Sequence, residues 1–201
     1  MRRLVICILG LVFFPLALVR GQNKTSEVDS LLALLPGLEG LELVDAYLNL
    51  SESYLYVTPV KTVEYAELAL QLVAGTEWKD RICHANLLIG TGLISGGEFV
   101  EGEKYASKAL DQARRLNNAR FISIGLSALS AFYMNTGDYE KALELLEETR
   151  EQATKAGLPD WDARAKFNIG SILTNRGDRA GGLRYMTDAL HYFESAGDNI
   201  I

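Results

Sequence analysis

The sequence predicts an all-α fold, a solenoid in which antiparallel helix hairpins stack along one axis. Two observations predict it: apolar residues follow a helical spacing, and similar residues recur at a constant step of 40. Such a step is typical of helical repeat proteins, in which each repeat buries its apolar face against the next. The recurring sets are Gly97, Gly137 and Gly177; Gly90, Ser130 and Gly170; Asn117, Gly157 and Gly197; Glu98, Asp138 and Asp178; and Ala109, Thr149 and Ala189.

Several of these sets predict helix ends. Gly97, Gly137 and Gly177 each follow a long apolar helical pattern, at the point where a residue with positive φ is favoured. The acid after each glycine is expected to cap the next helix by accepting hydrogen bonds from free backbone N–H groups. The second helix of each repeat is expected to end in the same way, at Asn117, Gly157 and Gly197.

The repeat unit is therefore a helix A, a tight turn, a helix B and a second turn. A mid-helix glycine costs about 1 kcal/mol relative to alanine, so we expect Gly90 and Gly170 to lie where two helices approach closely. Their expected neighbours are small residues on the next helix, either Ala109, Thr149 and Ala189 or Gly102 and Gly182.

Helix pairs are expected at 78–95 with 98–115, 118–135 with 138–156, and 159–175 with 178–195. A less regular first pair covers 43–56 and 60–73, with Pro59 as the first residue of its second helix. The hairpins accordingly occupy about 39–75, 78–115, 118–156 and 159–195, within a repeat domain of 39–199.

The N-terminus has the organisation of a signal peptide. Arg2 and Arg3 precede an uncharged run from Leu4 to Val19, and Gly21 offers a small residue for cleavage before Gln22. The run of 16 residues is shorter than the roughly 20 that span a membrane as a helix, although an uncleaved anchor remains an alternative. We expect a signal-peptide helix within residues 1–21, then a linker and capping helix over 22–38.

Charge and cysteine content limit the possible partners and disulfides of this chain. Loss of residues 1–21 removes three arginines and no acid, which changes the formal net charge from −6 to −9 and argues against a nucleic-acid partner. Of the two cysteines only Cys83 would remain, so no internal disulfide is expected. Cys83 is interpreted as a small buried residue, with a reactive thiol as the alternative.

The repeats resemble the tetratricopeptide repeat in a long form of 40 residues. Leu129-Ser130-Ala131-Phe132-Tyr133 leads to Gly137-Asp138-Tyr139-Glu140-Lys141-Ala142-Leu143, which is similar to the Leu-Gly-x-x-Tyr and Gly-Asp-Tyr stretches of that family. The resemblance covers about residues 39–199, although Gly102 and Gly182 stand where alanine is typical. It implies a right-handed superhelical solenoid that binds a protein or peptide.

A narrower resemblance concerns the N-terminal part. The signal peptide, the Val28–Leu32 stretch and the first repeat with Pro59 before Tyr65-Ala66 are similar to the sensing regions of bacterial histidine kinases, particularly from Bacteroidetes-like bacteria. This resemblance implies an exported, periplasmic or extracytoplasmic region of a signal-transduction protein. Contact with a membrane is then expected only through the signal segment or a downstream region.

No motif predicts catalysis, a cofactor or a metal site. The Gly90–Gly96 stretch superficially suggests a phosphate loop but lacks a preceding strand. His84 and His191 lie on different repeats without partners at ligand spacing. We therefore expect a non-catalytic scaffold, with a small exported helical enzyme as the alternative. A polar, charge-lined pocket deep between helices would favour that alternative.

The A helices of such solenoids face a concave surface that binds extended partners. The family geometry implies groove positions at Asp45, Asn49, Glu52, His84, Leu87, Thr91, Ser127, Ala131, Asn135, Arg164, Asn168 and Ser171. Arg164 together with side-chain amides is expected to hold a peptide backbone or a carboxylate. The alternative is that Asn135 and Asn168 only satisfy local backbone groups.

The last hairpin raises a separate expectation. Terminal repeats need a polar outer face or a capping helix, whereas the last B helix carries an apolar series. We expect it to be exposed, so that this chain is the front of a longer protein or associates through its uncapped C-terminal hairpin. The residues concerned are Leu183, Met186, Leu190 and Phe193.

Overall fold

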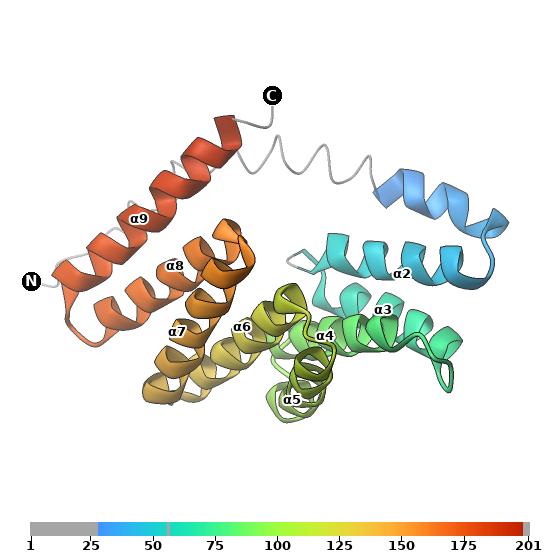
Figure 1. The fold of residues 1–201 in the computed structure, drawn as a ribbon, viewed down its shortest axis with the longest axis horizontal. Coiled ribbons are helices and arrows are strands. Elements are labelled where there is room, and N and C mark those ends of the chain that lie inside the picture. The colour runs from blue at the N-terminus through green and yellow to red at the C-terminus, as the bar shows by residue number, and fades with distance from the viewer. Residues whose placement is uncertain (1–27, 56, 199–201) are drawn as a thin grey trace, which may run out of the picture.

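The computed structural model describes residues 28–55 and 57–198, and this part of the chain consists of helices joined by short turns, without strands. Figure 1 shows the helices following an arc. Residues 28–34 form a first short helix. The other elements are the 3-10 helix η1 (Leu35–Gly37) and the helices α2 (Gly40–Tyr54), α3 (Pro59–Val73), α4 (Lys79–Ser95), α5 (Phe99–Arg115), α6 (Ala119–Thr136), α7 (Tyr139–Ala156), α8 (Pro159–Asn175) and α9 (Arg179–Asp198).

Four antiparallel hairpins make up the arc: α2 with α3, α4 with α5, α6 with α7, and α8 with α9. Each hairpin also packs on the next, through α3 on α4, α5 on α6 and α7 on α8. The A helices contact one another in succession, α2 with α4, α4 with α6 and α6 with α8, whereas successive B helices make no comparable contacts among the described residues. The A helices therefore line the inner, concave side of the arc.

The predicted helix ends are confirmed at the first turn of each regular repeat, where the glycines adopt positive φ: Gly97 (90°), Gly137 (85°) and Gly177 (96°). Asn117 (50°) and Gly157 (66°) do the same at the second turn. The prediction for Gly197 is wrong, because α9 continues through it to Asp198. Pro59 is the first residue of α3, as predicted.

The predicted caps are confirmed at two of the three acids. The Asp138 carboxylate accepts a hydrogen bond from the Lys141 backbone N at 3.1 Å, and that of Asp178 accepts one from the Gly181 N at 2.9 Å. Glu98 makes no side-chain capping bond. Its side chain is one methylene longer, which is unfavourable for a bond to the first turn of its own helix.

The mid-helix glycines lie where two helices cross closely. A Cβ at Gly90 would lie 2.6 Å from the backbone N of Ala106, and one at Gly170 would lie 2.7 Å from the backbone O of Gly182. A Cβ at Gly102 would in turn lie 3.0 Å from the Gly90 carbonyl oxygen. Of the two expected sets, the one with Gly102 and Gly182 is therefore correct, although the nearest neighbour of Gly90 is Ala106, which neither set contains. Ala109 instead meets Cys83, whose Sγ lies 3.4 Å from the Ala109 carbonyl oxygen.

The core runs along the solenoid as three apolar clusters, each shared between adjacent hairpins. Cys83 lies fully buried in the middle cluster, as predicted, and burial raises the pKa of its thiol to about 12, with the nearby charge of Asp80 adding to the effect. Representative members are Val44, Ala66 and Ile89 in the first cluster, Leu87, Leu110 and Leu126 in the second, and Leu146, Ile169 and Ile172 in the third.

The signal-peptide prediction falls on residues 1–21, which lie outside the described part of the chain. Among the helices that are described, none has both the length and the apolar character needed to cross a membrane.

Candidate binding surface

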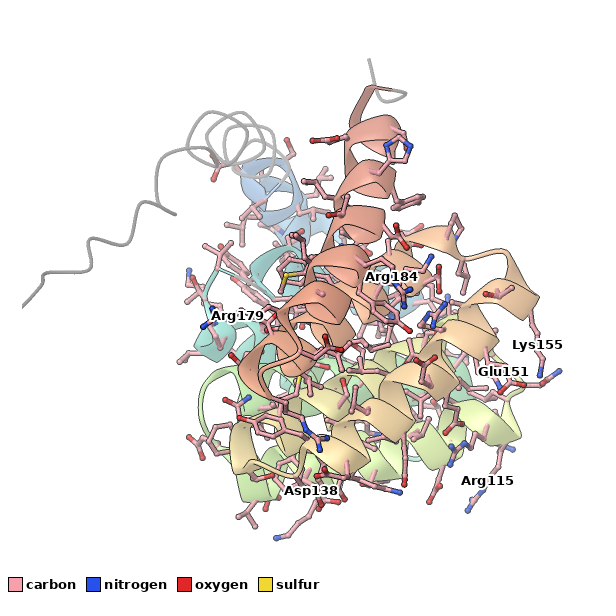
Figure 2. All side chains as sticks on the ribbon, turned by 90° about the vertical axis from the view of Figure 1, so that its left-hand side faces the viewer. Arg115, Asp138, Glu151, Lys155, Arg179 and Arg184 are labelled. Carbon is pink, nitrogen blue, oxygen red and sulfur yellow. The ribbon has the colours of Figure 1, made fainter. Side chains whose placement is uncertain are left out.

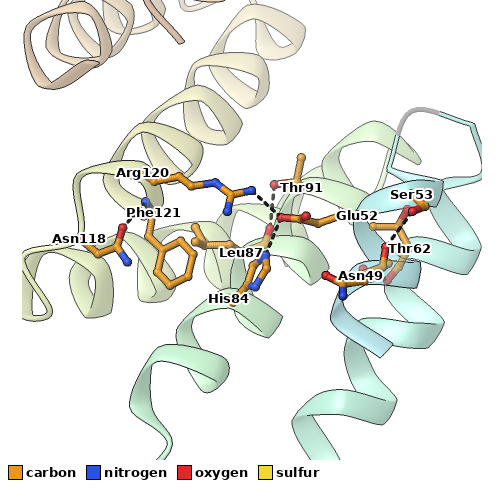
Figure 3. A network of polar contacts seen from close by, with 11 residues as sticks. Asn49, Glu52, Ser53, Thr62, His84, Leu87, Thr91, Asn118, Arg120 and Phe121 are labelled. Carbon is orange, nitrogen blue, oxygen red and sulfur yellow. Dashed lines mark hydrogen bonds and ion pairs between the residues drawn. The ribbon is translucent and has the colours of Figure 1, made fainter. Parts of the chain in front are cut away.

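Three successive A helices meet around one carboxylate on the concave side. Glu52 of α2 lies 2.9 Å from His84 of α4, measured from Oε1 to Nε2, and the same oxygen accepts a hydrogen bond from Arg120 of α6 at 3.1 Å. Figure 3 shows the two side chains converging on Glu52 from different helices. We call Glu52, His84 and Arg120 the inner cluster.

The electrostatics of the inner cluster favour an ionised Glu52. Its pKa is lowered from the ordinary value of 4.5, chiefly by the hydrogen bond with His84 and further by the charges of His84 and Arg120, against the opposing effect of burial. The His84 ring also stacks on Phe121, with ring centroids 5.1 Å apart, which fixes the imidazole between α2 and α6. The cluster thus connects three hairpins through charged side chains.

Arg120 gives the inner cluster an open side. Its side chain is 55 % exposed, and only one of its five N–H donors is used, on Glu52, within the described part of the chain. The sequence predicted Glu52 and His84 as groove residues but not Arg120. The corresponding repeat positions hold Asp80 and Asp160, so no recurring signal marked a cation there.

Asp45 is on the same surface but is already engaged. Its two carboxylate oxygens accept hydrogen bonds from Arg81 at 3.1 and 3.0 Å, a two-point ion pair between α2 and α4. The Arg81 guanidinium also donates to Asp80 at 2.7 Å. This pair connects the first two hairpins, and Asp45 is therefore a structural residue of the groove wall rather than a free ligand contact.

Other predicted groove residues satisfy their own helices. The Thr91 hydroxyl donates to the Leu87 carbonyl at 2.7 Å, and the Asn135 side-chain amide donates to the Ala131 carbonyl at 2.8 Å. Asn135 therefore satisfies a backbone carbonyl of its own helix, which is the alternative to a groove contact. Leu87 is fully buried in the core and contributes nothing to the surface. The exposed side chain of Asn49 and the half-buried Ser127, Asn168 and Ser171 remain groove candidates.

Arg164 marks the other end of the predicted groove, on α8. Its guanidinium carbon lies 5.8 Å from the centre of the Trp161 ring, a cation–π arrangement on the same helix. The side chain is exposed. Its part in binding a peptide stays a prediction, and its aromatic neighbour was not predicted.

Two hollows lie away from the inner cluster. One open hollow between α7, α8 and α9 has an apolar floor and an acidic rim, whose acids are paired: Glu140 with Arg176 at 2.8 Å, Glu144 with Lys141 at 2.7 Å and Glu147 with Arg150 at 2.9 Å. A second follows the outer surface of α7 as far as Glu151 and Lys155, which point outward in Figure 2. Both are open to solvent, unlike the deep pocket that the enzyme alternative requires. The first is lined by Glu140, Leu143, Glu144, Glu147, Ile169, Leu173 and Tyr185.

The described residues contain no group of three or more His, Cys, Asp or Glu side chains placed to hold a metal ion. His84 belongs to the inner cluster, and His191 lies on α9. The Gly90–Gly96 stretch continues α4 up to its C-terminal end and is not a phosphate loop.

Comparison with solved structures places this fold among tetratricopeptide-like helical repeats. The chain is 16% identical to a Rap protein complexed with competence and sporulation factor (TM-score 0.76), covering 86% of this chain and 50% of that one. It is 17% identical to aspartyl phosphate phosphatase F from Bacillus subtilis (TM-score 0.71), covering 88% and 50%. It is 18% identical to MamA (TM-score 0.53), covering 90% of this chain and 95% of that one. No protein-family model and no curated protein matches the sequence.

These similarities show the fold alone. The chain spans half the length of the first two structures. The predicted tetratricopeptide-like solenoid is confirmed in this sense. None of the three structures is described as a sensor kinase, so the narrower resemblance remains a prediction.

Proposed function

We propose that this chain is a non-catalytic scaffold that binds a protein or peptide along its concave surface. The observation that carries the proposal is the inner cluster, where residues from three hairpins meet beside a half-exposed guanidinium. Unused donors on Arg120 suit the carbonyl and carboxylate oxygens of an extended peptide. A structural neighbour, the Rap protein, is itself complexed with another molecule, the competence and sporulation factor.

Selection from a displayed random-peptide library tests this proposal, because it requires no candidate partner. Peptides selected on the full chain are expected to lose at least roughly tenfold in affinity for the variant Arg120→Ala, because a charge-assisted hydrogen bond is worth about 1.5–3 kcal/mol. The matched control is Lys104→Ala on α5, an exposed cation that pairs only with Glu101 among the described residues. Equal losses in both variants, or no loss in Arg120→Ala, contradict a concave site at Arg120.

Export and a role in signal transduction are part of the proposal. Export rests on the charged start, the apolar run and the small residue Gly21 in the sequence. The role in signal transduction rests on the resemblance of Val28–Leu32 and of the first repeat to the sensing regions of bacterial histidine kinases. A fusion of residues 1–40 to a reporter that is active only outside the cytoplasm is expected to be active, and the exported product is expected to begin at Gln22. An inactive fusion contradicts export, and an active fusion that retains residue 1 indicates an uncleaved anchor.

A further inference from the structure

Arg120 of the inner cluster is held less firmly than Arg81 on the same surface. Arg120 reaches Glu52 through one bond, from Nη2 to Oε1 at 3.1 Å, and the two side chains are 55% and 33% exposed. Arg81 instead binds both carboxylate oxygens of Asp45 and also donates to Asp80. An exposed one-point pair contributes little to stability, because solvent screens both charges. Of these two arginines, Arg120 is therefore the one that can exchange its partner at small cost.

Glu52 does not depend on Arg120 for a hydrogen bond. His84 Nε2 lies 2.9 Å from the same carboxylate oxygen, Oε1. The His84 side chain is 14% exposed and stacks on Phe121, which keeps the imidazole in place (Figure 3). When Arg120 turns away, Glu52 thus retains a partner within the fold. The exchange avoids the large cost of leaving a half-buried carboxylate without any partner.

A carboxylate brought by a ligand can use more of Arg120 than Glu52 does. A guanidinium group presents five N–H donors in a planar fork, which matches both oxygens of a carboxylate at once. Glu52 engages one of these donors. A ligand carboxylate that binds at two points is therefore favoured over the one-point contact with Glu52, whereas a neutral carbonyl oxygen lacks the charge that this exchange requires.

The inner cluster favours an acidic ligand over a basic one. A basic side chain would have to bind Glu52, which is two-thirds covered and already accepts two contacts on Oε1. The exposed donors belong to Arg120, and a second exposed arginine, Arg164, lies further along the A helices on α8. An acidic side chain is thus the group that meets complementary charge here.

We infer that the concave surface selects peptides that carry an acidic side chain, and that Glu52 is a built-in competitor which the peptide carboxylate displaces from Arg120. This inference rests on the proposed function and adds to it the charge of the ligand and the contact that regulates its binding. In the bound state the peptide carboxylate occupies Arg120 and Glu52 stays on His84. Glu52 therefore lowers the affinity for the ligand and excludes peptides that cannot replace it.

The composition of the peptides selected on the full chain tests the acidic preference. We expect Asp and Glu to be enriched over the unselected library on the wild-type chain, and this enrichment to disappear on Arg120→Gln. A selection that yields no binders contradicts the proposed function, and this inference with it. Binders that depend on Arg120 but show no enrichment of acids, or an enrichment of Lys and Arg, overturn this inference and leave the proposed function standing.

Calorimetric titration with a matched pair of peptides tests the role of Glu52. The pair consists of one selected acidic peptide and the same peptide with each acid replaced by its amide. Glu52→Gln is expected to bind the acidic peptide roughly threefold to tenfold more tightly than the wild type, because Arg120 is then free of its internal partner. The affinity for the amide peptide is expected to change less than about twofold. A purely structural Glu52 would instead weaken the binding of both peptides when it is replaced.

Two further variants complete this test. Asp45→Asn also removes a negative charge from the concave surface but leaves Glu52 on Arg120, so it is expected to change the acidic peptide's affinity less than about twofold. Glu52→Asp keeps the charge but shortens the side chain by one methylene, and it is expected to tighten binding in the same direction as Glu52→Gln. It provides the test if thermal unfolding shows that Glu52→Gln is not folded. Unchanged or weaker binding in the folded Glu52 variant, or an equal gain in Asp45→Asn, overturns the inference.

Discussion

The second and fourth hairpins share a repeat pattern but differ in how they are covered. In α4 and α5, the positions of Leu87, Leu110 and Ala113 are buried by α6. In α8 and α9, the same positions hold Phe167, Leu190 and Phe193 and are exposed. Local sequence makes the helices alike, whereas the packing of α6 on α4 and α5 makes these apolar positions part of the core.

Matched truncations give the largest expected contrast between the two hairpins. Leu110→Ala is expected to lower the free energy of unfolding by about 3 kcal/mol, because it leaves a cavity in a packed core. Leu190→Ala changes the equivalent position on α9. It is expected to lower the free energy of unfolding by under about 1 kcal/mol, since much of that side chain is already in water. Urea unfolding of the two variants measures both losses in free energy. Similar losses would contradict the expected difference between the hairpins.

The helix crossings are expected to behave alike in both hairpins. Gly90→Ala and Gly170→Ala each place a Cβ within 3 Å of backbone atoms of the facing helix, so each is expected to cost about 2 kcal/mol. Gly37→Ala is the control, because a Cβ there meets nothing within 4 Å. Thermal unfolding provides the comparison. If only Gly90→Ala destabilises, the fourth hairpin is packed more loosely than its crossing geometry indicates.

Removal of the helix cap is expected to destabilise the fourth hairpin more than the second. Asp178→Ala is expected to cost about 1 kcal/mol, because Asp178 caps α9, whereas Glu98→Ala is expected to change little, because Glu98 makes no capping bond to α5. Chemical denaturation of the two variants in parallel gives the difference. A larger loss of stability in Glu98→Ala than in Asp178→Ala would contradict this assignment of the caps.

The smallest expected effect is the pH dependence of the inner cluster. The pKa of Glu52 is lowered in the folded chain, so its ionised form stabilises the fold fully above 4.5, its ordinary value. That stabilisation is lost as the pH falls through the lowered pKa. In Glu52→Gln, the loss of stability in this acid range is expected to be shallower than in wild type. Glu98→Gln is the control, and an unchanged slope in Glu52→Gln contradicts the ion-paired state.

The elements of the fold that follow from local chemistry were predictable. Gly97, Gly137 and Asn117 occupy positive φ, a conformation that only a few residue types adopt readily, so their spacing marked the helix ends. The extension of α9 past Gly197 was not predictable in this way, because glycine permits a helix end without requiring one.

The candidate binding surface was predictable only in part. The A-helix positions identified Glu52 and His84, but the contact with Arg120 spans 68 residues of sequence and depends on how α6 packs beside α2 and α4. Asp45 and Asn135 have side chains typical of a groove, yet their hydrogen bonds are satisfied within the chain. Whether a polar side chain is available to a ligand depends on neighbours from other repeats.

The most direct test of the central claim is a chemical-shift map of the full chain titrated with one library-selected peptide. The account predicts that the largest changes occur on α2, α4 and α6, around Glu52, His84 and Arg120, and that they disappear in Arg120→Ala. Changes confined to the outer helices α3 and α5, or to the hollow between α7 and α9, would contradict a concave binding surface.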